Sequence, residues 1–217
     1  GTLYLVAGAL AVALPLGIAT AIYLIEYTAD TWLTRGIRAA VDLLNGTPSI
    51  VFGLFGFAFL VLFLNFGVSL IAGQITLGLM VLPTIIRTTE ESLRSIPKSL
   101  REGSYALGAS KWQTVWRVVL PPALPGIITG AILSIGRAAG ETAPIMFTAA
   151  VFSSRYLPSS LFEPVMSLPY HLFILTTSVA GADDQKFGTA LVLLMMVLSI
   201  YLIAILVRHR YNRATVV

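Results

Sequence analysis

Two oppositely charged residues interrupt an apolar run of this sequence. Arg137 and Glu141 are the only charged residues between Ala123 and Val151, and on a helix they lie one turn apart. A charge at mid-bilayer costs about 2.5–3.5 kcal/mol on insertion scales, so such residues normally face the interior of a helix bundle. The planar guanidinium of Arg suits oxyanions, and Glu141 would orient it or accept a proton from the anion. The pair predicts an anion site; a purely structural salt bridge is the alternative.

The same segment carries a stripe of small residues. At about 100° per residue, Gly126, Gly130 and Ser134 fall on the side of the helix that bears the charged pair. We therefore expect Ser134 to line the same path as the pair. Gly126 with Gly130, and Gly136 with Gly140, have the spacing that permits close contact between helices.

The composition indicates an integral membrane protein. Hydrophobic residues make up 57% of the 217 residues and charged residues 11%, whereas soluble domains have about 25% charged residues. The net charge of +4 does not indicate nucleic-acid binding, because cytoplasmic loops of membrane proteins are basic. The sequence has no cysteine, and His171 and His209 are isolated, so we expect no metal site. It also has neither a GxxxxGK[ST] phosphate loop nor a nucleophile–base arrangement, which predicts that this chain is not an enzyme and does not hydrolyse ATP.

Five segments qualify or nearly qualify as transmembrane helices, which need about 20 mostly apolar residues. They are Leu3–Ile25, Ser49–Leu64, Val68–Ile86, Ala123–Val151 and Phe187–Val207. Thr34–Leu44 has the pattern of a short amphipathic surface helix. Tyr170–Thr176, within the proline-containing segment Phe152–Lys186, is too short to span and is expected to be interfacial or re-entrant. The expected fold is all-α, a single membrane domain over residues 1–217.

The positions of lysine and arginine predict the orientation. Alternating the five helices puts eleven cations on one side: Arg35, Arg38, Arg87, Arg94, Lys98, Arg101, Lys111, Arg117, Arg208, Arg210 and Arg213. The other side receives Arg155 and Lys186. The positive-inside rule then places the first group and the C-terminus in the cytoplasm, and Arg87 is interpreted as an anchor at the membrane boundary. Gly1 falls outside, so a further helix is expected upstream of it.

The cytoplasmic stretch Ser99–Pro121 is predicted to form a helix, a glycine turn and a second helix. Two residue pairs have capping-box spacing, Ser99 with Glu102 and Ser110 with Gln113. Gly108 lies between them, where a helix end favours a left-handed residue. The pair Pro121-Pro122 is expected to stop or redirect the second helix. Glu102 has two interpretations at this point, as a capping residue or as a contact to a partner.

This stretch resembles the cytoplasmic loop of ABC importer permeases. In that family the loop reads EAA, three residues, G, nine residues, I, one residue, LP, and the same spacing occurs here at Glu102-Gly103-Ser104, Gly108, Val118 and Leu120-Pro121. Gly103, Ser104 and Val118 replace the two alanines and the isoleucine. The resemblance implies that residues 87–121 are a coupling loop, and that Glu102, Gly103, Ser104 and Gly108 contact the ATPase subunit.

A narrower resemblance covers most of the chain. Four stretches are similar to the A-type permease of phosphate-specific ABC importers: Leu44–Gly56, Arg87–Thr114, Leu124–Pro144 and Ser167–Phe173. The most specific element is RAAGETAP, from Arg137 to Pro144. The resemblance implies a type I ABC importer permease bundle in the bacterial inner membrane, with a coupling helix and with Arg137 and Glu141 on the phosphate path.

The same resemblance implies the partners. They are a C-type permease subunit that completes a heterodimer, an ATPase dimer that uses ATP and Mg, and an extracytoplasmic phosphate-binding protein. We expect no cofactor in this chain, and contacts with membrane lipid but not with nucleic acid. Two alternatives remain open, namely an ABC importer for phosphonate, molybdate or sulfate, and a secondary anion transporter or channel in which the loop is only structural.

Overall fold

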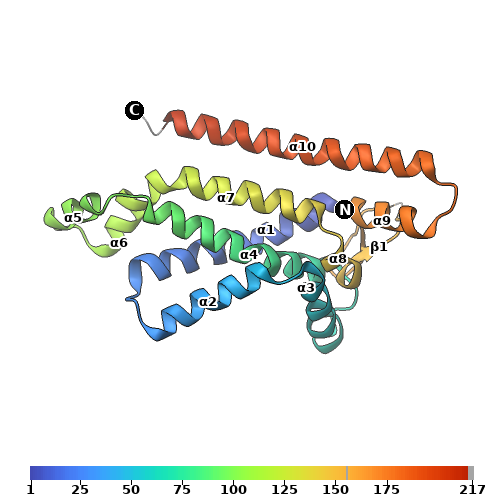
Figure 1. Ribbon diagram of the computed structural model, residues 1–217, viewed down its shortest axis with the longest axis horizontal. Coiled ribbons are helices and arrows are strands. Elements are labelled where there is room, and N and C mark those ends of the chain that lie inside the picture. The colour runs from blue at the N-terminus through green and yellow to red at the C-terminus, as the bar shows by residue number, and fades with distance from the viewer. Residues whose placement is uncertain (155, 215–217) are drawn as a thin grey trace.

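The computed structural model describes residues 1–154 and 156–214, so Arg155 lies outside it, as do the side chains of Arg210 and Arg213. Four helical stretches in this part of the chain are long and apolar enough to cross a membrane: Thr2–Tyr27, Leu70–Arg94, Lys111–Gly140 and Asp183–Leu206. They contain the helices α1 (Thr2–Ile22), α4 (Leu70–Arg94) and α7 (Leu120–Gly140) and most of α10 (Asp183–Ala214), and these helices extend along the long axis of the molecule (Figure 1). This arrangement confirms the predicted all-α membrane fold.

The contact between α1 and α4 forms the centre of the bundle. Its buried cluster includes Leu5, Ala9 and Ala13 of α1, with Leu77 and Met80 of α4. Lipid tails are as apolar as these side chains, so helices associate in a membrane mainly through close packing of small residues. The alanines of α1 provide such a surface, and α4 packs in turn against α7.

The segments predicted as a surface helix and a second span form one bent unit. Helix α2 (Trp32–Gly46) is followed by α3 (Ser49–Gly56) and a π-helical continuation, η2 (Phe57–Phe63), and the two parts differ in direction by 102°. The eight residues of α3 and the seven of η2 extend about 22 Å, less than the roughly 30 Å of a bilayer core. By length Ser49–Leu64 therefore falls short of a full span, and a fifth span is obtained when α2 and the α3–η2 segment are counted as one bent pair.

Helix α2 packs one face along α4 and leaves most of its other residues exposed, as predicted for an amphipathic surface helix. Val41 is buried against Ile86, and Ile37 is partly buried in the same cluster. The helix ends where Pro48 follows it, since proline has no N–H for the carbonyl of Leu44. The N–H of Thr47 donates to that carbonyl at 3.2 Å and closes the last turn.

The loop between α4 and α7 contains two short helices. Helix α5 (Lys98–Ala106) begins after Pro97 without a side-chain cap, so the capping box predicted at Ser99 and Glu102 is wrong. Helix α6 (Lys111–Thr114) begins with the predicted box between Ser110 and Gln113. Gly108 has φ +80°, as a left-handed turn between the helices requires.

The proline pair after α6 does not stop the helix. A π-helical stretch, η3 (Val115–Val119), joins α6 to α7, and Pro121 and Pro122 follow it at the start of α7 without ending the helix. The span predicted over Ala123–Val151 ends instead at Gly140. Pro144 explains this end, because it has no N–H to donate to the Gly140 carbonyl and its ring would clash with it.

Beyond Gly140 the chain builds a small cap at the end of the bundle opposite α5. Helix α8 (Ala143–Thr148) packs on α3, and β1 (Ala150–Val151) pairs in parallel with β2 (Val165–Met166). The segment before β2 supplies a hydrogen-bond acceptor for a free backbone N–H at the start of α4. The N–H of Leu70 donates to the Glu163 carbonyl at 2.8 Å. Helix α9 (Leu168–Ser178) follows, and its 11 residues extend about 16 Å, too short to cross a bilayer, as predicted.

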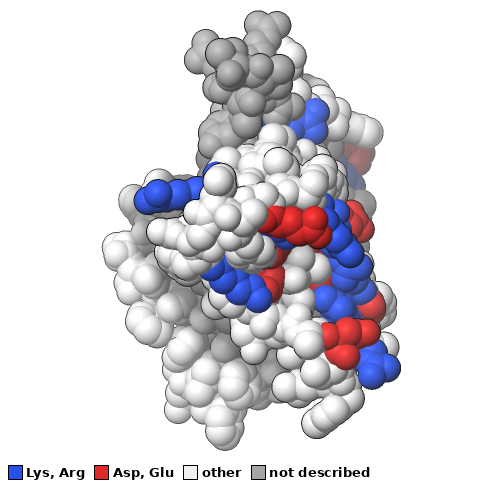
Figure 2. Space-filling model, turned by 90° about the vertical axis from the view of Figure 1, so that its left-hand side faces the viewer, with Lys and Arg blue, Asp and Glu red and all other residues white. Residues whose placement is uncertain are grey.

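The two ends of the bundle differ in charge. Helices α1 and α4 run toward the end that carries α5, and so does α10 (Figure 1). Figure 2 looks onto this end and shows a concentration of Lys, Arg, Asp and Glu side chains there. Of the predicted basic group, Arg94, Lys98 and Arg101 lie together beside α5 at this end.

Gly130→Leu should destabilise the bundle. A Cβ at Gly130 would collide with the side-chain oxygen of Thr88 on α4, and overpacking of this kind costs about 1–3 kcal/mol. Thermal unfolding of the detergent-solubilised protein measures the loss. The control is Gly36→Ala, since a Cβ there meets nothing within 4 Å. If the two variants unfold at the same temperature, α4 and α7 do not depend on this close approach.

Candidate functional site

Arg137 and Glu141 lie together at the end of α7. The Nε of Arg137 is 3.8 Å from Oε1 of Glu141, and the side chains are 33% and 19% exposed. Glu141 is the first residue beyond the helix, with φ −75° and ψ 137°, so its predicted position on the helical stripe does not apply. The pair forms nevertheless, because one extended residue keeps the carboxylate near the last turn.

Three elements converge on Arg137. Its Nη1 donates to Oγ1 of Thr84 on α4 at 3.5 Å, and that hydroxyl donates to Oδ1 of Asn45 on α2 at 3.3 Å. A guanidinium has five N–H donors. Among the described residues these two long contacts, to Thr84 and Glu141, are the protein partners of Arg137. The guanidinium is therefore partly exposed, held in place and able to donate to an anion.

The predicted stripe of small residues is a packing surface. Cβ atoms at Gly126 and Gly130 would collide with Ser92 and Thr88, so this face of α7 lies directly on α4. Ser134 is fully buried on it, and its hydroxyl donates to the Gly130 carbonyl at 2.9 Å. The structure therefore does not bring Ser134 to the exposed side of the charged pair.

The two glycines of the second pair, Gly136 and Gly140, differ in their surroundings. Gly136 approaches Tyr201 of α10, where a Cβ would collide with the ring and hydroxyl. Gly140 has nothing within 4 Å of a Cβ, because α7 ends there. Gly140 therefore makes no close helix contact among the described residues of this chain, and the close approach of α10 depends on Gly136.

An ionic cluster that the sequence did not reveal links α2 to α4. It consists of Arg38, Asp42, Arg87 and Glu90, two cations and two anions. Oε1 of Glu90 lies 3.2 Å from Nε of Arg38, and its Oε2 lies 3.3 Å from Nη1 of Arg87. Arg87 also pairs with Asp42. The Glu90 side chain is 2% exposed, so its charge is stabilised by the two arginines rather than by water.

The sequence contains a partial signal for this cluster. Arg38 and Asp42 are one turn apart on α2, and Arg87 and Glu90 nearly so on α4, so each pair lies on one helix face. The predicted third span ended at Ile86, which assigned Arg87 and Glu90 to a loop. Helix α4 continues to Arg94, and this extension brings both residues against α2.

The loop between α4 and α7, predicted to be the coupling loop, presents an exposed surface. Helix α5 has no buried residue, and Glu102, Gly103 and Gly108 are exposed. Ser104 instead faces α6, where its hydroxyl lies 2.9 Å from that of Thr114. Leu100 and Leu107 are 46% and 90% exposed and line the same shallow hollow, and a shared exposed apolar surface of this kind can mark a contact site.

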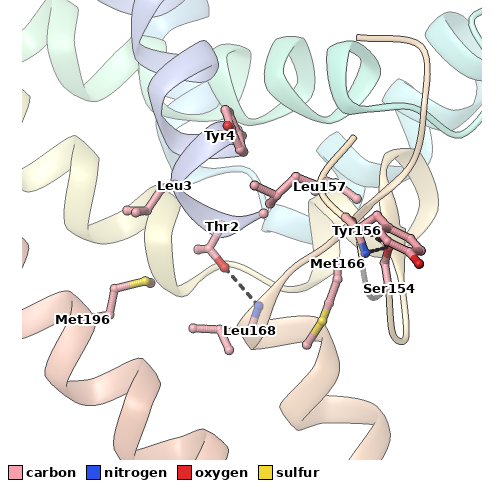
Figure 3. A pocket seen from close by; sticks show the side chains of 11 residues that line it. Thr2, Leu3, Tyr4, Ser154, Tyr156, Leu157, Met166, Leu168 and Met196 are labelled. Carbon is pink, nitrogen blue, oxygen red and sulfur yellow. Dashed lines mark hydrogen bonds between the residues drawn. The ribbon is translucent and has the colours of Figure 1, made fainter. Parts of the chain in front are cut away.

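Two cavities lie at opposite ends of the bundle. The cavity in Figure 3, about 470 Å³, lies between the start of α1, the cap and α10. Thr2 lines it and accepts a hydrogen bond from the Leu168 amide, and no described residue of the lining has a charged side chain. The second cavity, about 400 Å³, lies beside α5, and its charged lining residues are Glu26, Arg94, Lys98, Arg101 and Glu102.

A family model described as "Binding-protein-dependent transport system inner membrane component" matches residues 13–215. The "Phosphate transport system permease protein PstA 1" of Mycobacterium tuberculosis is 41% identical over 215 residues, 98% of this chain and 70% of that protein. The protein named PstA from Yersinia pestis is 40% identical over 208 residues, 96% and 69% of the two chains. The "Probable ABC transporter permease protein YqgI" of Bacillus subtilis is 36% identical over 200 residues, 86% and 68%.

Solved structures show the same fold. An inward-facing structure of the MetNI methionine ABC transporter superposes with a TM-score of 0.79 at 20% identity, covering 97% of this chain and 94% of that one. A bacterial ABC transporter that imports the polysaccharide alginate gives a TM-score of 0.74 at 16% identity, covering 96% and 77%. The type I ABC importer permease fold is therefore confirmed.

Glu90→Ala should destabilise the protein strongly. It leaves Arg38 and Arg87 without their shared partner, and breaking a buried ion pair costs about 3–5 kcal/mol. The measurement is thermal unfolding in detergent. Asp183→Ala is the control, because Asp183 is 73% exposed in its pair with Lys186 and such surface pairs contribute about 0–1 kcal/mol. Equal unfolding temperatures for the two variants would show that the ionic cluster does not stabilise the α2–α4 contact.

Proposed function

The chain belongs to the family of inner membrane components of binding-protein-dependent transport systems, and on this basis we propose that it is the A-type permease subunit of a phosphate importer. It is a multi-pass inner membrane protein and the transport subunit of an ABC importer rather than an enzyme. Such permeases work with an ATPase and a binding protein. The proposal concerns the substrate, the path residues and the specific partners.

The observation that carries the substrate assignment is the partly exposed guanidinium of Arg137. It lies at the junction of α2, α4 and α7, with a carboxylate 3.8 Å away that an oxyanion can displace. Relatives about 40% identical over nearly the whole chain are named phosphate transport permeases. Glu141 would hold the guanidinium in place when no anion is bound, and would accept a hydrogen bond from the P–OH group of hydrogen phosphate.

The mechanism is alternating access driven by the ATPase. Phosphate enters at the cap end, delivered by the binding protein, and closure of the ATPase dimer displaces α5 and α6. The helix from Lys111 to Gly140 is continuous over 30 residues, about 45 Å, and carries this displacement to Arg137. Binding at Arg137 has to be weak enough for release, and the loss of Glu141 during binding weakens it.

The specific partners and the orientation follow from the same proposal. A C-type permease subunit completes a heterodimer, and a separate ATPase dimer binds ATP and Mg. Glu102, Gly103 and Gly108 contact that ATPase, because they are exposed on the loop. The charged end in Figure 2 and the C-terminus are cytoplasmic, in agreement with the positive-inside rule.

Two other functions are separable by experiment. An importer of phosphonate, molybdate or sulfate would use the same guanidinium, and competition of these anions with phosphate uptake distinguishes them. A secondary transporter would need no ATPase, and its α5 would be structural. The exposed Leu107 favours a docking partner for α5, and co-purification with an ATPase tests this directly.

Arg137→Ala should abolish phosphate uptake while the complex still assembles. Removing charge-assisted hydrogen bonds to the anion weakens its stabilisation by about 1.5–3 kcal/mol, which is roughly 10- to 150-fold. Uptake of labelled phosphate by cells is the measurement, and co-purification of the ATPase verifies assembly. The control is Arg35→Ala, since Arg35 is 70% exposed in its pair with Asp30. Uptake at the wild-type rate in Arg137→Ala would exclude Arg137 from the path.

A further inference from the structure

Arg101 of α5 connects the coupling loop to two membrane helices. Its Nε and Nη2 donate to Oε1 of Glu26 at 3.1 and 2.7 Å. Its Nη1 donates to the carbonyl of Ile96 at 2.8 Å, and Nη2 also donates to that of Leu93 at 2.9 Å. The side chains of Arg101 and Glu26 are 16% and 5% exposed. One guanidinium thus holds α5, the end of the first span and the end of α4 together.

The position of Glu26 is unfavourable without this contact. It lies in the π-helical turn η1 (Tyr23–Tyr27) that ends the first span, and a carboxylate near a helix C-terminus is repelled by the helix dipole. It is also buried, so its charge requires a partner. Of the two carbonyls that Arg101 binds, that of Leu93 lies in the last turn of α4 and receives a long hydrogen bond of 3.4 Å from the Ile96 N–H, and that of Ile96 lies beyond the helix end. Arg101 therefore provides the cation that Glu26 needs and N–H donors for these two carbonyls.

Helix α5 has few other connections to the membrane helices. None of its residues is buried, and its other side-chain hydrogen bond, from Ser104, goes to α6 within the loop. A separate apolar cluster, which includes Leu93, Val115 and Val119, packs η3 against α1 and α4. Packed apolar surfaces can slide past one another in shear motions, whereas a forked guanidinium bound to three acceptors fixes distance and direction.

We propose that Arg101 is a positioning residue for coupling, which makes the first span and α4 move together with α5 when the ATPase displaces the loop; this rests on the proposed function. Without it, the loop remains connected to α7 through the continuous helix from Lys111, but α5 no longer pulls on α1 and α4. Displacing α7 alone changes its contact with α4 near Arg137 without moving the bundle as a unit. ATP hydrolysis then continues while transport falls.

The test uses the complete transporter, with both permease subunits, the ATPase and the binding protein, in liposomes. Phosphate uptake and ATP hydrolysis are measured on the same sample for the wild type, Arg101→Ala, Arg101→Lys and Glu26→Gln. Couplings between sites typically amount to about 5- to 150-fold, so we expect the phosphate transported per ATP in Arg101→Ala to fall at least about fivefold. Arg101→Lys should be intermediate, because one ammonium cannot reach all three acceptors with the same geometry.

The matched control is Arg94→Ala, a cation that lines the same cavity and forms no ion pair among the described residues. It should keep the wild-type ratio. A wild-type ratio in both Arg101→Ala and Glu26→Gln overturns the proposal. So does loss of the ATPase from purified complexes of all three test variants, since the contact would then serve assembly alone.

Failure of the proposed function has a different result. In that case the wild-type complex takes up no phosphate, although its ATPase responds to a binding protein loaded with sulfate, molybdate or a phosphonate. The ratio is then measured with that anion, and the expected fall in Arg101→Ala is unchanged.

Discussion

Glu90 lies almost completely buried between Arg38 and Arg87, and the arrangement of the bent unit depends on this contact. Buried charges are stable only when paired and hydrogen-bonded, and the low dielectric of a membrane domain enforces this strongly. Since Arg38 belongs to α2 and Glu90 to α4, pairing determines where α2 lies. Arg38 also donates to the Leu24 carbonyl at 3.0 Å, which ties the same helix to the first span.

Polar contacts of this type continue along the bundle in both directions. Toward α5, the buried pair of Glu26 and Arg101 joins the first span to the loop. Toward the cap, Asn45 and Thr84 lead to Arg137. The ion pairs and hydrogen bonds therefore lie at helix junctions, while small residues determine how closely the helices approach elsewhere. Such junctions can be displaced as units, which an alternating-access permease requires.

Prolines decide where the charged pair lies. Pro48 ends α2 and lets α3 turn aside, and Pro144 ends α7 at Gly140, so that α8 packs on α3. A Cβ at Gly53 of α3 would come within 2.6 Å of the Ala143 carbonyl, so the two short helices are in close contact. Pro121, in contrast, follows the π-helical stretch η3 and does not end the helix, which continues to Gly140. The same residue type thus ends a helix at one position and is accommodated beside a π-helical turn at another.

The sequence by itself determined the features that depend on neighbours within about one helical turn. These are the long apolar spans, the capping box at Ser110, the left-handed Gly108 and the proximity of Arg137 to Glu141. Only the tertiary structure decided which distant charges meet. Arg38 and Glu90 are 52 residues apart, and Arg101 and Glu26 are 75 apart. Hydrophobic periodicity shows which face of a helix is buried, but not which other helix covers that face. The pairing of buried charges depends on which helices meet, so the sequence alone does not reveal it.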